Sequence, residues 1–149
     1  MHKKGQAAME FLMTYGWAIL VVLVAIGALA YFGVLSPGKF LPESCTIAPG
    51  YSCEDFKIGT DGSATVILKN GAKATLNTIS VSIGAVAATA CNPNTGLAVG
   101  SITTCTWAAA SLATGTAGER FKDTVSFTYT EAGSTISHTK TGDIIVKYE

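Results

Sequence analysis

Near the start of the chain, a few residues have the types and the spacing needed for one chemical event, the cutting of a peptide bond. Lys3 and Lys4 precede Gly5, which is followed by Gln6 and, four positions later, by Glu10. A glycine suits a protease that must grip the backbone closely, because it has no side chain. Cleavage after Gly5 would make Gln6 the new terminus, with an amine whose pKa of about 7.7–8.0 leaves it positive at neutral pH. Removal of this basic leader after Gly5 is therefore a hypothesis that these residues allow.

Glu10 is the only charged residue between Gly5 and Gly38. An unpaired carboxylate in hydrocarbon costs roughly 2.5 kcal/mol or more, so a partner is expected. After cleavage, Gln6 and Glu10 would stand one helical turn apart, near the spacing at which side chains meet. The carboxylate could stabilise the start of its own helix, or it could neutralise the terminus of a neighbouring subunit when the register is right. We therefore predict that Gln6 and Glu10 set the register of an assembly.

These residues head a long apolar segment that must position them. From Trp17 to Leu35, about 19 residues contain neither charge nor proline, which is about the length that spans a bilayer as a helix. A secretory signal peptide is the alternative, since "AIGALA" imitates a cleavage site, but its apolar core would be only about 7–15 residues long. The greater length favours a retained helix, and the lysines before it place the N-terminus in the cytoplasm.

The apolar pattern stops at "LSPGKFLP". Pro37 lacks an amide donor and Gly38 suits a cap or turn, so we expect the helix to end near Leu35. The predicted organisation is a leader over residues 1–5, a hydrophobic helix over 6–36 and an extracellular β-rich head over 37–149.

Beyond Glu43 the pattern changes to short strands separated by turn residues, which predicts an α+β chain with an antiparallel, sandwich-like head. The clearest hairpin is "VSFTYTEAGSTISHT", where "EAGS" supplies the turn. The stretches "GAVAATA" and "WAAASLATG" are left unassigned. The expected strands are Phe56–Ile58, Ala64–Lys69, Thr78–Ile83, Leu97–Thr103, Thr124–Thr130, Thr135–Thr139 and Ile144–Tyr148.

Four cysteines, Cys45, Cys53, Cys91 and Cys105, all follow the apolar segment. An even number in an exported domain favours disulfides, with three possible connectivities. We expect local pairing of Cys45 with Cys53 and of Cys91 with Cys105, because both loops are short and bounded by turn residues. A metal site is not expected, because clustered pairs such as CxxC are missing.

Composition and motifs argue against several classes of function. The formal charge is zero and the pI is about 6.7, so no basic surface is expected to bind nucleic acid. The chain contains no GxSxG, HExxH, P-loop or dinucleotide motif, so neither an enzyme nor a cofactor is expected. His138 has no evident acid partner and is expected to be a surface histidine. The mixed charges from Glu119 to Asp123 indicate a solvated face.

The N-terminal pattern resembles the class III signal of archaeal type IV pilins and their relatives. In that family a basic leader ends in a glycine, the cut exposes a glutamine, a glutamate stands at the fifth mature position, and an apolar helix follows. Ala8 replaces a common serine and Thr14 a common leucine, while the glycine, glutamine and glutamate positions hold. The resemblance does not reach the head, which in this family is variable and β-rich. The matching residues are Lys3 and Lys4, Gly5, Gln6, Glu10 and Phe11–Leu35.

The resemblance implies that a prepilin peptidase recognises Lys3, Lys4, Gly5 and Gln6 and cuts between Gly5 and Gln6. It also implies that the helices leave the membrane and pack into a filament core, where small residues permit close approach and bulky residues fill the remaining space. The residues expected to pack this core are Phe11, Tyr15, Gly16, Trp17, Gly27, Tyr31 and Phe32.

The expected protein is thus the precursor of a structural filament subunit at the cell surface, with adhesion as its role. Its expected partners are identical subunits, the prepilin peptidase, the pilus assembly machinery and, before assembly, the cytoplasmic membrane, with no nucleic acid. Two alternatives stay open. One is a minor pilin or pseudopilin that caps or primes a filament, and the other is a monomeric, membrane-anchored extracellular binding protein.

Overall fold

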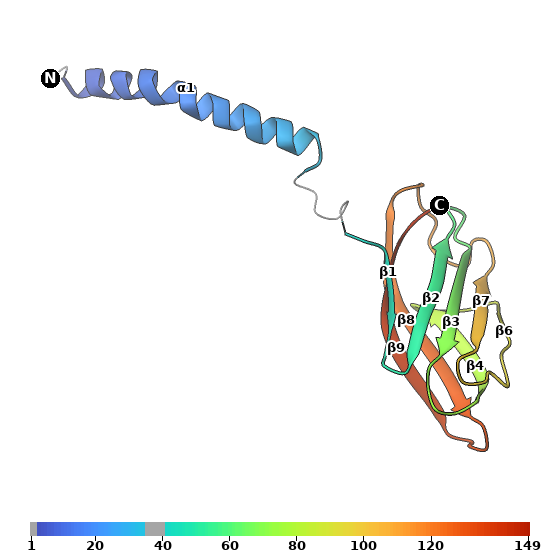
Figure 1. Ribbon diagram of the computed structural model, residues 1–149. Helices are drawn as coiled ribbons and strands as arrows, with labels where there is room; N and C mark the ends of the chain where they lie inside the picture. Colours follow the sequence, from blue (N-terminus) through green and yellow to red (C-terminus); the bar gives the residue numbers. More distant parts are fainter. Residues whose placement is uncertain (1–2, 35–40) are drawn as a thin grey trace. The chain divides into compact units, whose positions relative to one another are not determined.

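The computed structural model describes residues 3–34 and 41–149 (Figure 1). The chain divides into two compact units, Met1–Pro42 and Glu43–Glu149. The first unit contains one long helix, and the second, which we call the head, contains antiparallel sheets. The coarse prediction of an apolar N-terminal helix followed by antiparallel strands is therefore confirmed.

The helix, α1, runs from Lys3 to Tyr31 and ends in a glycine cap. Gly33 has a φ of 70°, and its amide donates to the carbonyl of Ala30 at 3.1 Å. The amide of Val34 donates to the carbonyl of Leu29 at 3.2 Å. This pair of bonds is the Schellman arrangement, which satisfies the last carbonyls of a helix. The predicted end near Leu35 was too late, because Gly33 stops the helix first; Pro37 and Gly38 lie outside the described residues.

The head contains two sheets whose neighbouring strands are all antiparallel. The five-stranded sheet has the order β1 (Ser44–Ile47), β9 (Ser137–Lys147), β8 (Arg120–Glu131), β4 (Leu76–Ile83), β5 (Val86–Ala87). The four-stranded sheet has the order β2 (Tyr51–Ile58), β3 (Ala64–Asn70), β7 (Ile102–Trp107), β6 (Ala90–Asn92).

Alternation of apolar and polar residues explains how these strands build one core. In β3, Ala64, Val66 and Leu68 are buried, whereas Thr65 and Ile67 point to the other face, as expected for a period of two. Buried residues from both sheets belong to a single hydrophobic cluster. Among its largest fully buried side chains are Phe127, Ile58, Leu68, Leu76 and Ile83.

Two of the predicted strands at the C-terminal end are in fact one. β9 continues through Gly142, although "KTGD" looks like a turn in the sequence. A side chain at Gly142 would collide with the backbone of Thr46 in β1. The glycine is therefore needed for the close approach of a neighbouring strand and does not break β9.

Other strand boundaries also differ from the prediction. β7 begins at Ile102, whereas the prediction began at Leu97, which instead forms an isolated bridge with Leu76. β1, β5 and β6 were not predicted, since each is at most 4 residues long. β2, β4 and β8 extend beyond their predicted cores. Short strands carry too few residues for an alternating pattern to show, and pairing partners decide where they form.

The two disulfides have the local pairing predicted from the sequence. Cys45 in β1 is bonded to Cys53 in β2, with 5.8 Å between the Cα atoms, so this bond joins the two sheets. Cys91 in β6 is bonded to Cys105 in β7, its direct cross-strand partner, with 4.0 Å between the Cα atoms. No free cysteine is left in the described residues.

Candidate functional site

The surface of α1 is the main candidate site, because nothing in the chain covers it. None of the helix residues is buried, and Trp17, for example, is 72% exposed. At 1.5 Å per residue, the 29 residues span about 44 Å, more than the roughly 30 Å of a bilayer's hydrocarbon core. The helix is long and apolar enough to cross a membrane. A helix that is apolar all round is stable only when lipid or other protein surrounds it.

The predicted cleavage residues Lys3, Lys4, Gly5 and Gln6 all lie in the first turns of α1 and are exposed. A Cβ atom added at Gly5 would meet nothing within 4 Å, so packing within the chain does not require glycine here. Glycine weakens a helix by roughly 1 kcal/mol relative to alanine, and helix ends fray most easily. The Gly5–Gln6 bond therefore lies where α1 can open locally at the least cost.

The Glu10 carboxylate forms no hydrogen bond or ion pair with any residue in the described ranges. It lies four positions after Gln6 in the same helix, so the two side chains share a face. Thr14 extends that face, and its hydroxyl donates to the backbone carbonyl of Glu10 at 2.9 Å. This bond was not predicted from the sequence, and it gives the Thr14 hydroxyl donor a partner in an apolar environment. Glu10 is thus the polar group on this face that still needs a partner.

Apart from Trp17, the predicted packing residues form aromatic pairs or are glycines with open space beside them. The rings of Phe11 and Tyr15 lie 4.6 Å apart, one turn from each other, and those of Tyr31 and Phe32 lie 5.7 Å apart. A Cβ at Gly16 or Gly27 would meet nothing within 4 Å. These glycines are eleven positions apart, close to three full turns, so they lie on nearly the same face. That face can approach another helix closely.

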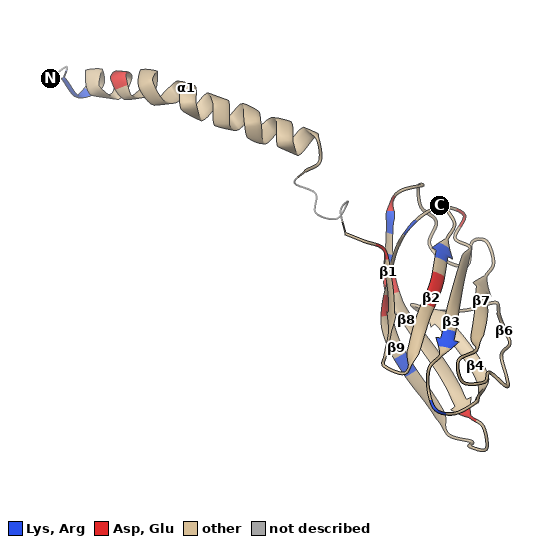
Figure 2. Ribbon diagram, in the orientation of Figure 1, with Lys and Arg blue, Asp and Glu red and all other residues tan. Residues whose placement is uncertain are grey.

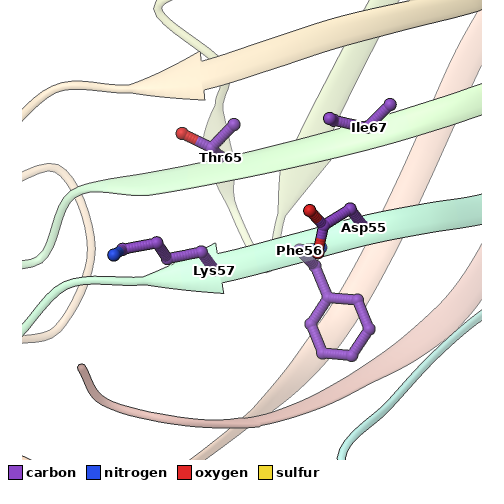
Figure 3. Close-up of a pocket in the computed structure, with 5 residues that line it drawn as sticks. All are labelled: Asp55, Phe56, Lys57, Thr65 and Ile67. Carbon is purple, nitrogen blue, oxygen red and sulfur yellow. The ribbon is translucent and has the colours of Figure 1, made fainter.

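The head offers a small depression between β2 and β3, shown in Figure 3. Asp55, Phe56, Lys57, Thr65 and Ile67 line it, and its volume is about 190 Å³. The Phe56 ring points away from Thr65 and Ile67 (Figure 3) and packs against the core. Ligand pockets usually measure about 300–1,000 Å³. This depression is therefore too small to indicate a small-molecule site.

An aromatic cluster bridges the two sheets of the head. The Tyr51 ring lies 5.0 Å from Phe127 and 5.1 Å from Tyr129. Burial, together with a hydrogen bond and the proximity of Tyr129, raises the pKa of Tyr51 well above its ordinary value. His138 is exposed, as expected, and stacks on Tyr129 with the ring centres 5.5 Å apart. The cluster packs the head and contains no acid–base pair.

The described part of the chain contains no group of three His, Cys, Asp or Glu side chains that could hold a metal ion. No protein-family profile matches the chain, and no curated protein or solved structure is significantly similar to it. Any function must therefore be argued from the residues themselves. The main candidates are Gly5, Gln6 and Glu10, because they lie in α1, whose surface nothing in the chain covers.

Proposed function

We propose that this protein is the precursor of a structural subunit of an archaeal type IV pilus-like filament, which polymerises through α1. The observation that carries the proposal is the unpartnered Glu10 in a helix whose residues are all uncovered within the chain. A simple membrane anchor gains nothing from a carboxylate in this position, whereas a polymer can supply its partner from a neighbouring subunit.

Processing would create that partner. Removal of residues 1–5 leaves an amine on Gln6, one helical turn from Glu10 on the same face. In a bundle of helices, the amine of one copy can neutralise the carboxylate of the next, and removing either member would leave an uncompensated buried charge. Only the register that brings the two groups together is then tolerated.

The rest of α1 supports the same assembly. Gly16 and Gly27 leave an open stripe for close helix approach, and the aromatic residues at both ends supply bulk and interfacial anchoring. Contacts that do not close into a ring generate open helical filaments. We propose that α1 waits in the cytoplasmic membrane and then forms the filament core.

The head would lie outside the cell as a compact, sandwich-like domain. Two disulfides favour an oxidising, extracellular environment. A sandwich-like head in this position would form the outer surface of the filament, where adhesion takes place.

The first experiment is intact-mass and N-terminal peptide analysis of protein recovered from the native cell surface. A mature chain that begins at Gln6 is the expected result, and helical filaments should then be visible by electron microscopy. A surface pool that still carries Met1 to Gly5 would overturn the filament proposal and leave the membrane-anchored monomer as the better hypothesis.

A further inference from the structure

The register of β8 and β9 defines two opposite ends of the head. Arg120 pairs with Lys147 at one end, and Thr130 pairs with Ser137 at the other. β8 has 12 residues, which at about 3.3 Å per residue separate the two ends by roughly 36 Å. A charged group at one end therefore cannot touch a charged group at the other end of the same head.

The strands of the four-stranded sheet run between the same two ends of the head. Ile58, the last residue of β2, forms a bridge with Tyr148, next to the Arg120–Lys147 pair. Tyr51, the first residue of β2, packs on Tyr129 near the other end. Each charged residue of the head can therefore be placed by the register of its strand or, in a loop, by the strand end next to it.

The end that contains Arg120 is acidic, and we call it the acidic end. It carries five carboxylates against four basic side chains, an excess of one negative charge. Lys57 and Glu149 form an ion pair there at 3.0 Å, which leaves the balance unchanged. The carboxylates of the acidic end are Glu43, Asp61, Glu119, Asp123 and Glu149.

The end that contains Thr130 is basic, and we call it the basic end. Lys69 and Lys73 lie there with only one carboxylate, Glu131, an excess of one positive charge (Figure 2), and Lys140 lies nearer the middle of β9. None of these lysines forms an ion pair within residues 3–34 and 41–149. Glu54 and Asp55 lie midway along β2, and Lys140 and Asp143 lie three residues apart near the middle of β9, so these four belong to neither end. The two ends are thus equal and opposite in charge.

Exposed apolar side chains gather at the basic end as well. Within the described residues of the head, the large apolar side chains that remain exposed are Val99, Ile102 and Ile136, at 54%, 50% and 65%. Ile102 pairs with Lys69, and Ile136 stands next to Ser137 at the β8–β9 turn. Apolar residues among unpaired lysines are typical of a protein contact, in which charges surround an apolar centre.

We propose that the heads of two copies of this chain bind each other head to tail, the basic end of one against the acidic end of the next. Opposite charges attract the two ends, and like charges disfavour contact between two identical ends. Because the two surfaces differ, the contact does not close into a pair and can repeat along a row of copies. This goes beyond the proposed function, which assigns assembly to α1, and it does not require that filaments form.

The test uses the full chain in vesicles of phosphatidylcholine, as an equal mixture of unlabelled and ¹⁵N-labelled protein. A carbodiimide joins a carboxylate to an amine without a spacer, so it links only groups in contact. Linked peptides of mixed isotope, joining Lys69 or Lys73 to a carboxylate of the acidic end, are expected. Their yield should fall at least fivefold between about 0.01 M and about 1 M salt, where the Debye length shrinks from about 30 to about 3 Å.

A variant with Val99→Ser, Ile102→Ser and Ile136→Ser keeps every reactive lysine and carboxylate. We expect its mixed-isotope yield to fall at least fivefold at low salt. The link between Lys57 and Glu149 within one copy serves as the internal control, because their ion pair is 3.0 Å long and lies at the acidic end. A variant that keeps this link and both disulfides has a folded head.

Three results would overturn the proposal. They are the lack of mixed-isotope links while the Lys57–Glu149 link forms, mixed-isotope links that join two basic or two acidic ends, and a yield that the folded serine variant leaves unchanged. Each can be obtained whether or not the chain polymerises, so the failure of this proposal is distinguishable from the failure of the filament proposal.

Discussion

α1 and the head differ in whether their apolar residues are buried within the chain. The head packs 19 hydrophobic residues from its two sheets and their connecting loops into its own core, whereas no residue of α1 is buried. The head can therefore hold its fold with contacts made within the chain. The helix needs an environment that the chain does not provide, which is lipid before assembly and other copies afterwards in the function proposed above.

The same contrast holds for single polar groups. Asn70 is fully buried, and its side chain makes three hydrogen bonds, to the carbonyls of Ala74 and Leu97 and from the amide of Ala72. Glu10 makes none with the described residues. A polar group that is satisfied within the chain indicates a structural role, and one that is left unpaired in an apolar helix indicates a partner from outside.

The largest effect is expected at Glu10. Glu10→Ala should reduce filament yield at least a hundredfold, because the mature amine of each neighbour would lose its partner. Membrane insertion and the unfolding midpoint of the head should stay unchanged. Filament counting by electron microscopy and membrane fractionation test this result. Glu10→Gln, which keeps the shape and removes the charge, should behave like Glu10→Ala, and normal filaments from either variant would contradict the role of the charge in setting the register.

In the head, Leu68→Ala should lower the free energy of unfolding by about 2–5 kcal/mol, because the side chain is only 1% exposed. Denaturation of the full chain in detergent, followed by the fluorescence of the buried Trp107, measures this loss. The matched substitution Leu20→Ala changes an exposed residue of α1 and should leave the unfolding of the head unaffected. Equal effects of the two variants would contradict the independence of helix and head.

Asn70→Ala should lower the free energy of unfolding of the head by about 2–4 kcal/mol, because it leaves the carbonyls of Ala74 and Leu97 and the amide of Ala72 without this partner. The same denaturation experiment measures it. Asn94→Ala, at an exposed position, serves as the control and should change the free energy by less than about 0.5 kcal/mol. Similar losses in the two variants would argue against the role of Asn70.

Removal of the disulfide between the sheets should have a somewhat smaller effect. Replacing Cys45 and Cys53 together by alanine opens a loop with a sequence separation of 8, worth about 2.5 kcal/mol in the chain-entropy model. The unfolding midpoint of the head should fall accordingly, while the membrane fraction of the full chain should not change. A loss of membrane insertion in this variant would mean that helix and head depend on each other.

The smallest effect concerns alkaline pH. The pKa of Tyr51 lies above its ordinary value of 10.0, chiefly because of burial, so the folded head holds the phenol proton after the unfolded chain has lost it. The free energy of unfolding should therefore fall as the pH rises above about 10. Unfolding curves of wild type and Tyr51→Phe between about pH 8 and pH 11 should differ in slope, with the variant falling less steeply. If the free energy of unfolding fell equally steeply with pH in both proteins, groups other than Tyr51 would account for the loss of stability at alkaline pH.

Local patterns predicted the long elements and missed the short ones. The apolar run predicted α1, and the alternation of apolar and polar residues in Ala64–Asn70 predicted β3. β5, with 2 residues, carries no readable pattern and exists because Ile83 and Ser82 supply its ladder. The end of α1 was misplaced because Pro37 and Gly38 are stronger sequence signals than Gly33, whose role depends on a positive φ that the sequence does not display.

The candidate site was predictable to a similar degree. Gly5, Gln6 and Glu10 are neighbours in sequence, so helical periodicity alone places them together. The bond from Thr14 to the carbonyl of Glu10 was missed, although threonine four residues after a carbonyl in a helix is a known signal for it. The charged ends of the head were not predictable, because their residues are scattered over most of the strands and loops.

The sequence by itself determined an apolar helix with one carboxylate near its start, a change to β structure beyond Glu43, and local disulfides, because each depends on residues close together along the chain. Only the tertiary structure decided the sheet order, the passage of β9 through Gly142 beside Thr46, and the grouping of Lys69 with the exposed Ile102 and Ile136 at one end of the head. These features depend on strand register, in which residues far apart in sequence become neighbours, and no local pattern encodes it.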